Sequence, residues 1–187
     1  IGYVGLPVCI ALVKTGFDVV GYDIDEARVK LLRAGGSYVD DVSDAEVTTS
    51  LERGFHPTTD PKELGAVPVH VFAVPTDFRN GKPQMGPLED AVRTVATQRQ
   101  GRGDTLFVVT STVYPGATAE LVEPTVSEHE FTVGDDALVA IAPERINPGD
   151  GKGVEDLPVN IGADDKEARR ATATLYRQIA SAVHTFD

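Results

Sequence analysis

The chain opens on a glycine-rich loop whose spacing suits a bound dinucleotide. In Gly2-Tyr3-Val4-Gly5 the two glycines stand three residues apart, directly before an apolar helical pattern. They match the second and third glycines of the G-x-G-x-x-G fingerprint, whose first glycine would precede Ile1. A residue without Cβ lets the backbone approach a pyrophosphate, and the N-terminus of the following helix adds partial positive charge. A tight strand-to-helix turn that binds no ligand explains this loop alone about equally well.

An acidic residue follows at the distance expected of a ribose-binding acid. Asp23 lies 18 residues after Gly5, at the end of the next expected strand. A carboxylate there accepts hydrogen bonds from the adenosine ribose hydroxyls and repels the extra phosphate of NADP, so we expect NAD as the cofactor. Arg28 could cover the adenine or reach a phosphate, although an exposed helix-surface arginine explains it equally well. A solvated acid at a strand end is the corresponding alternative for Asp23.

Three more expected strand ends carry side chains that suit chemistry. They are Pro75 and Thr76, then Ser111 and Thr112, and finally Glu144, Arg145 and Asn147. Because ligands of an open parallel sheet bind at the carboxyl ends of its strands, we expect these residues to surround cofactor and substrate. Ordinary turn and capping chemistry explains the hydroxyls and the proline in isolation, and a surface ion pair explains the charged residues.

Apolar stretches and helical periods alternate along the chain and position these junctions. The alternation predicts an α/β fold, a Rossmann-type doubly wound, mostly parallel sheet whose first strand is truncated. Segment 143–158, rich in glycine and proline, is the longest irregular stretch and is expected to be functional. The expected strands are 17–23, 67–74, 105–110, 138–142, 159–162 and 182–186, and the expected helices are 4–15, 25–33, 43–53, 88–95 and 168–179.

Composition bounds the possible partners. The 187 residues predict one domain, 1–187, with a single core. A net charge of -12 has the wrong sign for binding nucleic acid, and no stretch is apolar enough to span a membrane, so we expect a cytoplasmic protein. The single cysteine, Cys9, excludes a cysteine-rich zinc site, and the four histidines are scattered, so we expect no metal.

Five motifs follow one another at the expected strand ends. Together they resemble the N-terminal NAD-binding domain of the UDP-glucose/GDP-mannose dehydrogenases. The resemblance implies a parent enzyme that oxidises the C6 alcohol of a nucleotide sugar to the uronate while two NAD are reduced, and that we expect to be a homo-oligomer. The motifs are Gly2-Tyr-Val-Gly-Leu-Pro7, Gly21-Tyr-Asp-Ile-Asp25, Val74-Pro-Thr76, Ser111-Thr-Val-Tyr-Pro-Gly116 and Pro143-Glu-Arg-Ile-Asn-Pro-Gly149.

Two features narrow the resemblance to one branch of the family. The Pro-Glu-Arg form at residues 143–145 is similar to the UDP-N-acetylmannosamine, UDP-N-acetylglucosamine and GDP-mannose enzymes, whereas UDP-glucose enzymes more often carry Pro-Glu-Phe-Leu. Segment Gly36-Ser-Tyr-Val-Asp-Asp41 resembles the N-acetylhexosamine branch. The expected substrate is therefore UDP-N-acetylmannosamine, UDP-N-acetylglucosamine or UDP-glucose.

The resemblance also assigns roles to individual residues. It implies that Thr112 and Glu144 are catalytic, with Glu144 orienting a water or acting as a base. Glu144, Arg145 and Asn147 would contact the substrate. Asp77 replaces the proline that usually closes the Val-Pro-Thr-Pro motif, which puts the local contact to the nicotinamide side in doubt. The residues that would line NAD are Gly2, Tyr3, Val4, Gly5, Asp23, Arg28, Pro75, Thr76, Ser111 and Thr112.

Other parts of the family's catalytic machinery lie outside this sequence. The resemblance implies a thioester-forming cysteine, a lysine and an asparagine in the central and C-terminal regions. Cys9 lies among apolar residues of the first expected helix and reads as a buried hydrophobe rather than a substitute. We therefore expect a fragment truncated at its N-terminus, inactive alone and marginally stable in solution.

Two other functions remain open from the sequence. A hydroxyacid dehydrogenase of the 6-phosphogluconate or 3-hydroxyisobutyrate type would share the glycine loop but not the motif at residues 143–149. A non-catalytic NAD-sensing module would need the glycines and Asp23, but not Thr112 and Glu144 together. Replacing Thr112 by alanine in the full-length parent separates the sensor, which would be indifferent, from a dehydrogenase.

Overall fold

The chain folds into alternating helices and strands. The computed structural model describes residues 1–187 except 80, 101–102, 147–148, 150 and 187. The helices are α1 Gly5–Lys14, α2 Glu26–Arg33, α3 Asp44–Glu52, α4 Gly86–Thr97, α5 Glu123–Ser127 and α6 Lys166–Tyr176. The strands are β1 Val19–Tyr22, β2 Phe55–Thr58, β3 Val69–Phe72, β4 Phe78–Arg79, β5 Lys82–Pro83, β6 Thr105–Val109, β7 Ala137–Ile141, β8 Pro158–Gly162 and β9 Ala182–Phe186.

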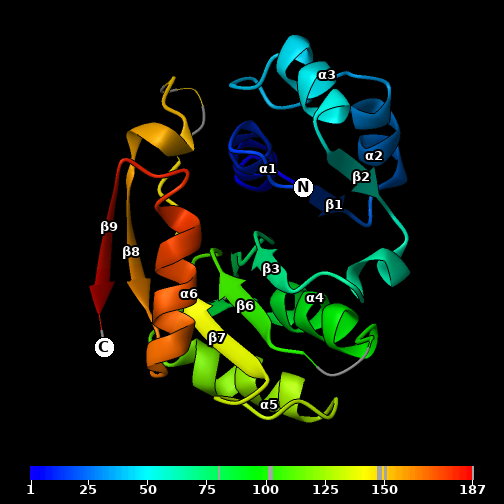
Figure 1. The fold of residues 1–187 in the computed structure, drawn as a ribbon. Coiled ribbons are helices and arrows are strands. Elements are labelled where there is room, and N and C mark those ends of the chain that lie inside the picture. The colour runs from blue at the N-terminus through cyan, green and yellow to red at the C-terminus, as the bar shows by residue number, and fades with distance from the viewer. Residues whose placement is uncertain (80, 101–102, 147–148, 150, 187) are drawn as a thin grey trace.

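The strands of the main sheets run mostly parallel. One sheet has the order β3-β6-β7-β8-β9, and a second holds β1 and β2, while β4 and β5 form a small antiparallel hairpin. In the five-stranded sheet only the β7–β8 pair is antiparallel, through Ile141 and Gly162. Figure 1 shows the two-stranded and five-stranded sheets lying apart. Helix α1 lies beside β1 and β2, above α6 in this view. The expected α/β class with a mostly parallel sheet is confirmed.

Strand β6, which lies between β3 and β7, is packed on both faces, which makes the fold doubly wound. Leu106 and Val108 belong to a core cluster that includes residues of α1 and α6. Phe107 and Val109, which point the other way, pack in a cluster with residues of α4 and α5. This alternation explains why β6 reads as an unbroken apolar run, because strands covered on both faces need no polar side.

Helix α1 joins the two sheets. Its residues Val8 and Leu12 pack in the cluster of the five-stranded sheet. Its other face, with Leu6 and Ile10, packs in a cluster with α2, α3 and β2. A helix that is apolar all round is one that is buried all round, which accounts for the almost wholly apolar sequence of this segment.

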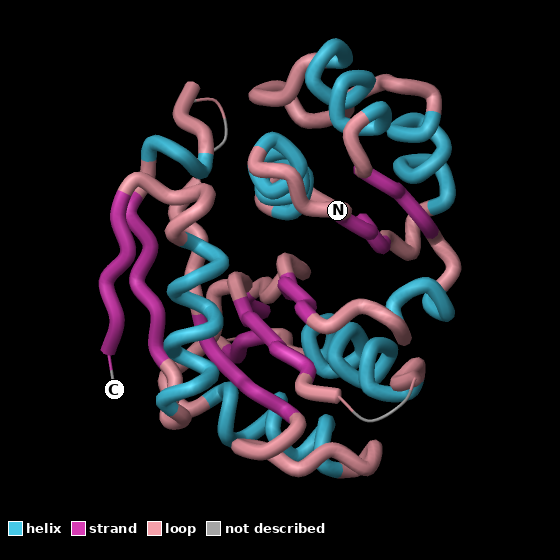
Figure 2. The backbone as a smooth tube through the Cα atoms, viewed as in Figure 1, coloured by secondary structure: helices cyan, strands magenta, loops and turns pink. Residues whose placement is uncertain are grey.

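An apolar cavity of about 340 Å³ lies between β1 and β3. Within the described ranges β1 pairs only with β2, and β3 only with β6, so each strand has an unpaired edge. The cavity is lined by both strands and by side chains of α1 and α4, including Val8, Leu12 and Val95. Figure 2 shows β1 and β3, both magenta like the other strands, on either side of this cavity. The two sheets therefore share helical packing but no backbone hydrogen bonds between β1 and β3.

The expected helices form at the expected places because their end signals are local. Asp25 caps α2 by accepting from the N–H groups of Ala27 and Arg28 at 2.9 and 3.2 Å. Gly35 ends the same helix with a φ of 82°, which favours glycine. Ser43 and Glu46 form a capping box at the start of α3.

Several elements were not predicted from the sequence, among them β2, the 3-10 turn Pro61–Leu64, the hairpin of β4 and β5, and the helical turns between Thr118 and Ser127. Strand β2 contains Pro57 and lacks alternation, and it forms because it pairs with β1. The hairpin of β4 and β5 is held by two residue pairs. Between Thr118 and Ser127 the chain forms a π-helical turn followed by α5, although Pro124 interrupts the helical pattern. Segment 143–158 is irregular as expected among its described residues, apart from a short 3-10 turn at Val154–Asp156.

Candidate functional site

The glycine loop leads into an uncapped helix N-terminus. Helix α1 has no side-chain cap at Val4 and no acidic residue in its first turn, whereas α2, α3 and α6 are capped by side chains. A Cβ built on Gly2 would meet nothing within 4 Å, and one on Gly5 would lie 3.7 Å from Ala73. Among the first four residues of α1, Pro7 has no N–H, and the N–H groups of Leu6 and Val8 already donate to the carbonyls of Gly2 and Val4 at 3.0 and 3.3 Å. The N–H of Gly5, which has no such partner among the described residues, is the one that this end of α1 can offer to a phosphate.

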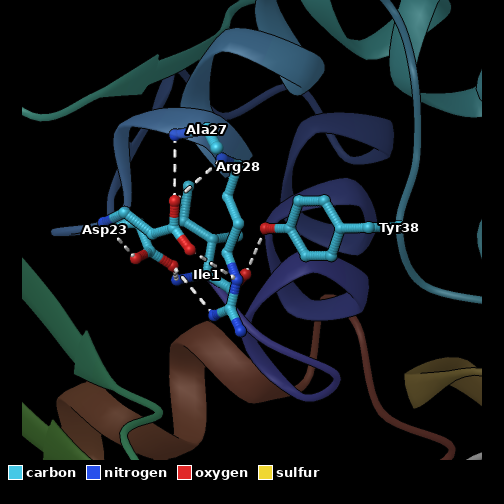
Figure 3. Close-up of polar contacts among 6 residues, drawn as sticks. Ile1, Asp23, Ala27, Arg28 and Tyr38 are labelled. Carbon is cyan, nitrogen blue, oxygen red and sulfur yellow. Dashed lines mark hydrogen bonds and ion pairs between the residues drawn. The ribbon is translucent and has the colours of Figure 1, made fainter.

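Asp23 lies at the carboxyl end of β1 in a cluster of polar contacts (Figure 3). Its Oδ2 accepts a hydrogen bond from the Ile1 nitrogen at 2.5 Å and lies 3.6 Å from Arg28 Nη1. Its Oδ1 accepts from the N–H of Asp25 at 2.9 Å. Burial alone would raise the pKa of the Asp23 carboxyl, but these hydrogen bonds and the charge of Arg28 hold it below its ordinary value. Asp23 is therefore ionised at neutral pH.

Tyr38 joins this cluster, and sequence reasoning assigned it no role. Its hydroxyl donates to the carbonyl of Ile1, and the Arg28 guanidinium lies 5.5 Å from the centre of its ring. A cation over an aromatic ring is held electrostatically. The ring thus orients Arg28 beside Asp23. The aromatic residue within the Gly36–Asp41 motif was the signal in the sequence, but nothing local connects it to a residue ten positions earlier.

The carboxyl ends of β3, β6 and β7 are joined by hydrogen bonds. The Thr110 hydroxyl donates to the carbonyl of Phe72 at 2.9 Å. The Ser111 hydroxyl donates to the carbonyl of Val74 at 2.8 Å and accepts from its N–H at 2.9 Å. The N–H of Glu144 donates to the carbonyl of Thr110 at 3.2 Å. Three of the strand ends that the sequence selected therefore lie together.

The two threonines at these ends have different surroundings. Thr76 donates its hydroxyl proton to the carbonyl of Thr112 at 2.6 Å, so it fixes the position of the second loop. The side chain of Thr112 is exposed, as is that of Pro75. Ser111 is buried, and its hydroxyl is committed to the backbone of Val74. Thr112 thus offers an accessible hydroxyl, whereas the hydroxyls of Ser111 and Thr76 bond to the backbone and fix the two loops to each other.

Glu144 is a half-buried acid with an unsatisfied oxygen. Its Oε2 is buried and has no hydrogen-bond partner in the part of the chain that the structure describes. Burial raises the pKa of the Glu144 carboxyl to about 6, against a smaller opposing effect of a hydrogen bond from the Arg145 N–H. A carboxyl with a pKa near neutrality can both take up and release a proton.

The loop that carries Glu144 contacts a segment far away in the sequence. Asp41 Oδ2 accepts a hydrogen bond from the N–H of Gly149 at 2.7 Å. This contact brings the Gly36–Asp41 motif beside the Pro143–Gly149 motif. Arg145 is exposed. Asn147, which the sequence also selected, lies outside the described residues.

The remaining groups give no sign of other chemistry. Burial raises the pKa of the Cys9 thiol to about 11, so the thiol is protonated and a poor nucleophile. Among the described residues, His, Cys, Asp and Glu form no group suited to a metal ion. No helix in the described ranges is long and apolar enough to cross a membrane.

These features suit both halves of a bound dinucleotide, the adenosine half and the nicotinamide half. An uncapped helix follows the glycine loop, and an ionised acid stands at the end of the neighbouring strand, with the accessible Thr112 at the end of β6. This arrangement is that of a dinucleotide-binding α/β domain, and the carboxylate of Asp23 favours NAD over NADP.

Comparison with known proteins identifies the family. The family model described as UDP-glucose/GDP-mannose dehydrogenase family, NAD binding domain, matches residues 1–180. Protein CapL of Staphylococcus aureus is 33% identical over 186 residues, which cover 97% of this chain. UDP-N-acetyl-D-mannosamine dehydrogenase of Pyrococcus horikoshii is 33% identical over 182 residues, 95% of this chain. The chain belongs to the UDP-glucose/GDP-mannose dehydrogenase family, and NAD is the cofactor of this domain.

A solved structure agrees with this assignment. The UDP-D-ManNAc dehydrogenase structure from P. horikoshii superimposes with a TM-score of 0.91 at 30% identity and covers 100% of this chain and 45% of its own. The chain spans about two fifths of the curated relatives that it matches, 42% of CapL and 43% of the P. horikoshii protein. The family match favours the nucleotide-sugar dehydrogenase over the two other functions that the sequence left open.

Proposed function

We propose that the chain, residues 1–187, is the NAD-binding domain of a dehydrogenase that oxidises the C6 alcohol of a UDP-sugar to the uronate in two hydride transfers. The central and C-terminal sugar-nucleotide domains would be supplied by the rest of the protein, so this part alone would be inactive. Bound NAD supplies the hydride acceptor. The observation that carries the proposal is the half-buried Glu144 carboxyl beside the strand ends that present Thr112.

The two-stranded sheet would hold the adenosine side of NAD. Gly2, Tyr3, Val4 and Gly5 would donate backbone hydrogen bonds to the pyrophosphate, because α1 has no cap of its own. The ionised carboxylate of Asp23 would accept hydrogen bonds from the ribose hydroxyls. Arg28, held by Asp23 and Tyr38, would lie over the adenine or against a phosphate.

The five-stranded sheet would hold the reacting side. Pro75 and Thr76 would border the nicotinamide, while Ser111 would fix their loop through Val74. The Thr112 hydroxyl would hydrogen-bond the substrate oxygen or a water. Glu144 would accept a proton from that water at a carboxylate oxygen, because at neutral pH a group with a pKa of about 6 is mostly ionised.

The sugar would be an N-acetylhexosamine. Arg145 is exposed at the same loop and would contact the sugar or its phosphates through bidentate hydrogen bonds. Asn147 would provide an amide. The Asp41–Gly149 hydrogen bond supports this choice, because it couples the N-acetylhexosamine-like motif Gly36–Asp41 to the loop of Glu144.

We also propose that the whole protein acts in the cytoplasm as a homo-oligomer, without nucleic acid or membrane partners. The net charge of -12 of residues 1–187 supports the absence of a nucleic-acid partner, because negative charge repels the phosphate backbone. Light scattering of the purified whole protein tests the oligomeric state, and a monomer would contradict it.

The decisive experiment uses the whole protein and four nucleotide sugars, UDP-N-acetylmannosamine, UDP-N-acetylglucosamine, UDP-glucose and GDP-mannose. We expect two NADH per molecule of one UDP-N-acetylhexosamine. Glu144→Gln and Thr112→Ala should each lower kcat by at least roughly 100-fold, the usual size of an acid–base contribution. Glu167→Gln, an exposed surface acid paired with Arg170, is the matched control and should keep full activity. Full turnover by both site variants would overturn the assignment.

A further inference from the structure

Two buried polar atoms near the proposed catalytic acid have no hydrogen-bond partner within the described ranges. One is Oε2 of Glu144, and the other is the hydroxyl of Tyr176. Tyr176 is fully buried, with 0% of its surface exposed. Native proteins rarely leave such groups unpaired, and an unpaired group calls for an explanation such as a bound water or a catalytic role.

The two side chains belong to the same part of the core. Tyr176 is the last residue of α6, and it packs in the cluster that contains Ala142. Ala142 precedes Glu144 by two residues and begins the loop after β7. The charge of Glu144 also contributes to the raised pKa of the Tyr176 phenol, after the larger effect of burial. The hydroxyl therefore lies within the electrostatic reach of the carboxylate.

The two groups have complementary hydrogen-bonding needs. A phenol is a donor, and an ionised carboxylate only accepts. They form no direct hydrogen bond, and buried polar groups separated by more than hydrogen-bond distance are commonly joined by an ordered water. The Glu144 carboxyl accepts from the Arg145 N–H of its own loop. The Thr110 carbonyl, just after β6, accepts from the Glu144 N–H and not from its carboxyl.

We propose that Tyr176 is a positioning residue whose hydroxyl holds Glu144 Oε2 through one buried water. The phenol donates to the water, and the water donates to Oε2. Oε1, which accepts from the Arg145 N–H, keeps a second lone pair for the reacting water. The inference rests on the proposed function of Glu144. It adds a reason why an otherwise apolar cluster keeps a hydroxyl at the end of α6.

The test is Tyr176→Phe in the whole protein, followed by the pH dependence of kcat. Removing a donor that stabilises the ionised carboxylate should raise the pKa of the acid limb by roughly one unit. Rates on the acid limb should fall by roughly tenfold, which corresponds to about 1.4 kcal/mol. Thr172→Val is the matched control, because it removes another buried hydroxyl of α6, one that donates to the carbonyl of Ala168 at 2.8 Å. It should leave the limb in place.

Two further measurements separate this inference from the proposed function. A double-mutant cycle of Tyr176→Phe and Glu144→Gln, measured by urea unfolding, should give a non-zero coupling even if Glu144 proves not to be catalytic. A high-resolution crystal structure of the unmodified protein should show a water within hydrogen-bond distance of both oxygens. An unshifted acid limb, zero coupling or the lack of such a water would each overturn the proposal. Full activity of Glu144→Gln would overturn the catalytic assignment instead.

Discussion

The two-stranded and five-stranded halves of the molecule hold their site residues in different ways. In the five-stranded half, hydroxyl and backbone hydrogen bonds join β3, β6 and β7 under Thr112 and Glu144. These bonds lie over a core in which Phe107 stacks on Phe72 and meets Phe131 edge-on, at ring-centre distances of 6.1 and 5.3 Å. The reacting side is thus built on β6, an interior strand that is packed on both faces.

In the two-stranded half, polar contacts hold the groups that face the cofactor. The buried Asp23 accepts from the N–H of Asp25 and lies 3.6 Å from Arg28, whose side chain is 49% exposed. An ion pair with an exposed partner contributes little to stability and is weakened by salt. The two halves therefore differ in how they position their groups. Side-chain packing positions the proposed catalytic groups, whereas charged side chains such as Asp23 and Arg28 would select the cofactor. The predictions below test that difference.

The largest effect is expected from breaking the core of the five-stranded half. Phe107→Ala should lower the free energy of unfolding by about 3–5 kcal/mol, because it removes a fully buried ring and leaves a cavity. Urea unfolding of the whole protein measures the loss. Phe78→Ala, at a side chain that is 72% exposed, is the control and should change stability by less than about 0.5 kcal/mol. Equal losses would contradict the described core.

A smaller effect on stability, but a specific one on binding, is expected at Asp23. Asp23→Ser in the whole protein should weaken NAD binding by roughly 10- to 100-fold, the value of hydrogen bonds to a charged group, and should narrow the preference over NADP. Titration calorimetry with both cofactors measures this. Glu26→Gln removes an exposed charge three residues away, so it should leave NAD affinity nearly unchanged. Unchanged affinity in Asp23→Ser would remove the ribose role.

The smallest expected effect is the pH dependence that Glu144 gives to stability. Its pKa in the folded protein, about 6, lies above its ordinary value of 4.5. The folded state therefore binds the proton more tightly, and this contribution is complete below pH 4.5 and lost as pH rises through 6. Partial exposure limits it to about 1 kcal/mol. Urea unfolding between pH 4 and 7 should show a smaller loss of stability with rising pH in Glu144→Gln than in the unmodified protein, and identical slopes would contradict the assignment.

Much of the fold could be predicted because its signals are local. The caps at Asp25 and Ser43 and the apolar run of β6 are short-range patterns, and each formed the expected element. Strand β2 could not be predicted, since its Pro57 breaks the pattern and only the pairing with β1 defines it. The sequence was enough to name the candidate site residues. It was not enough to predict which of them share a loop, form a hydrogen bond or are buried.

The sequence by itself determined the family, through a glycine loop, an acid 18 residues later and three motifs at strand ends. Only the tertiary structure decided that Thr76 bonds the Thr112 loop, that Asp41 reaches Gly149, and that the two sheets are joined through α1. It also decided that Tyr176 and Glu144 share a buried neighbourhood. The physical reason is that caps and periodicities are set within a few residues, whereas these contacts join residues 32 to 108 positions apart and depend on how the helices pack.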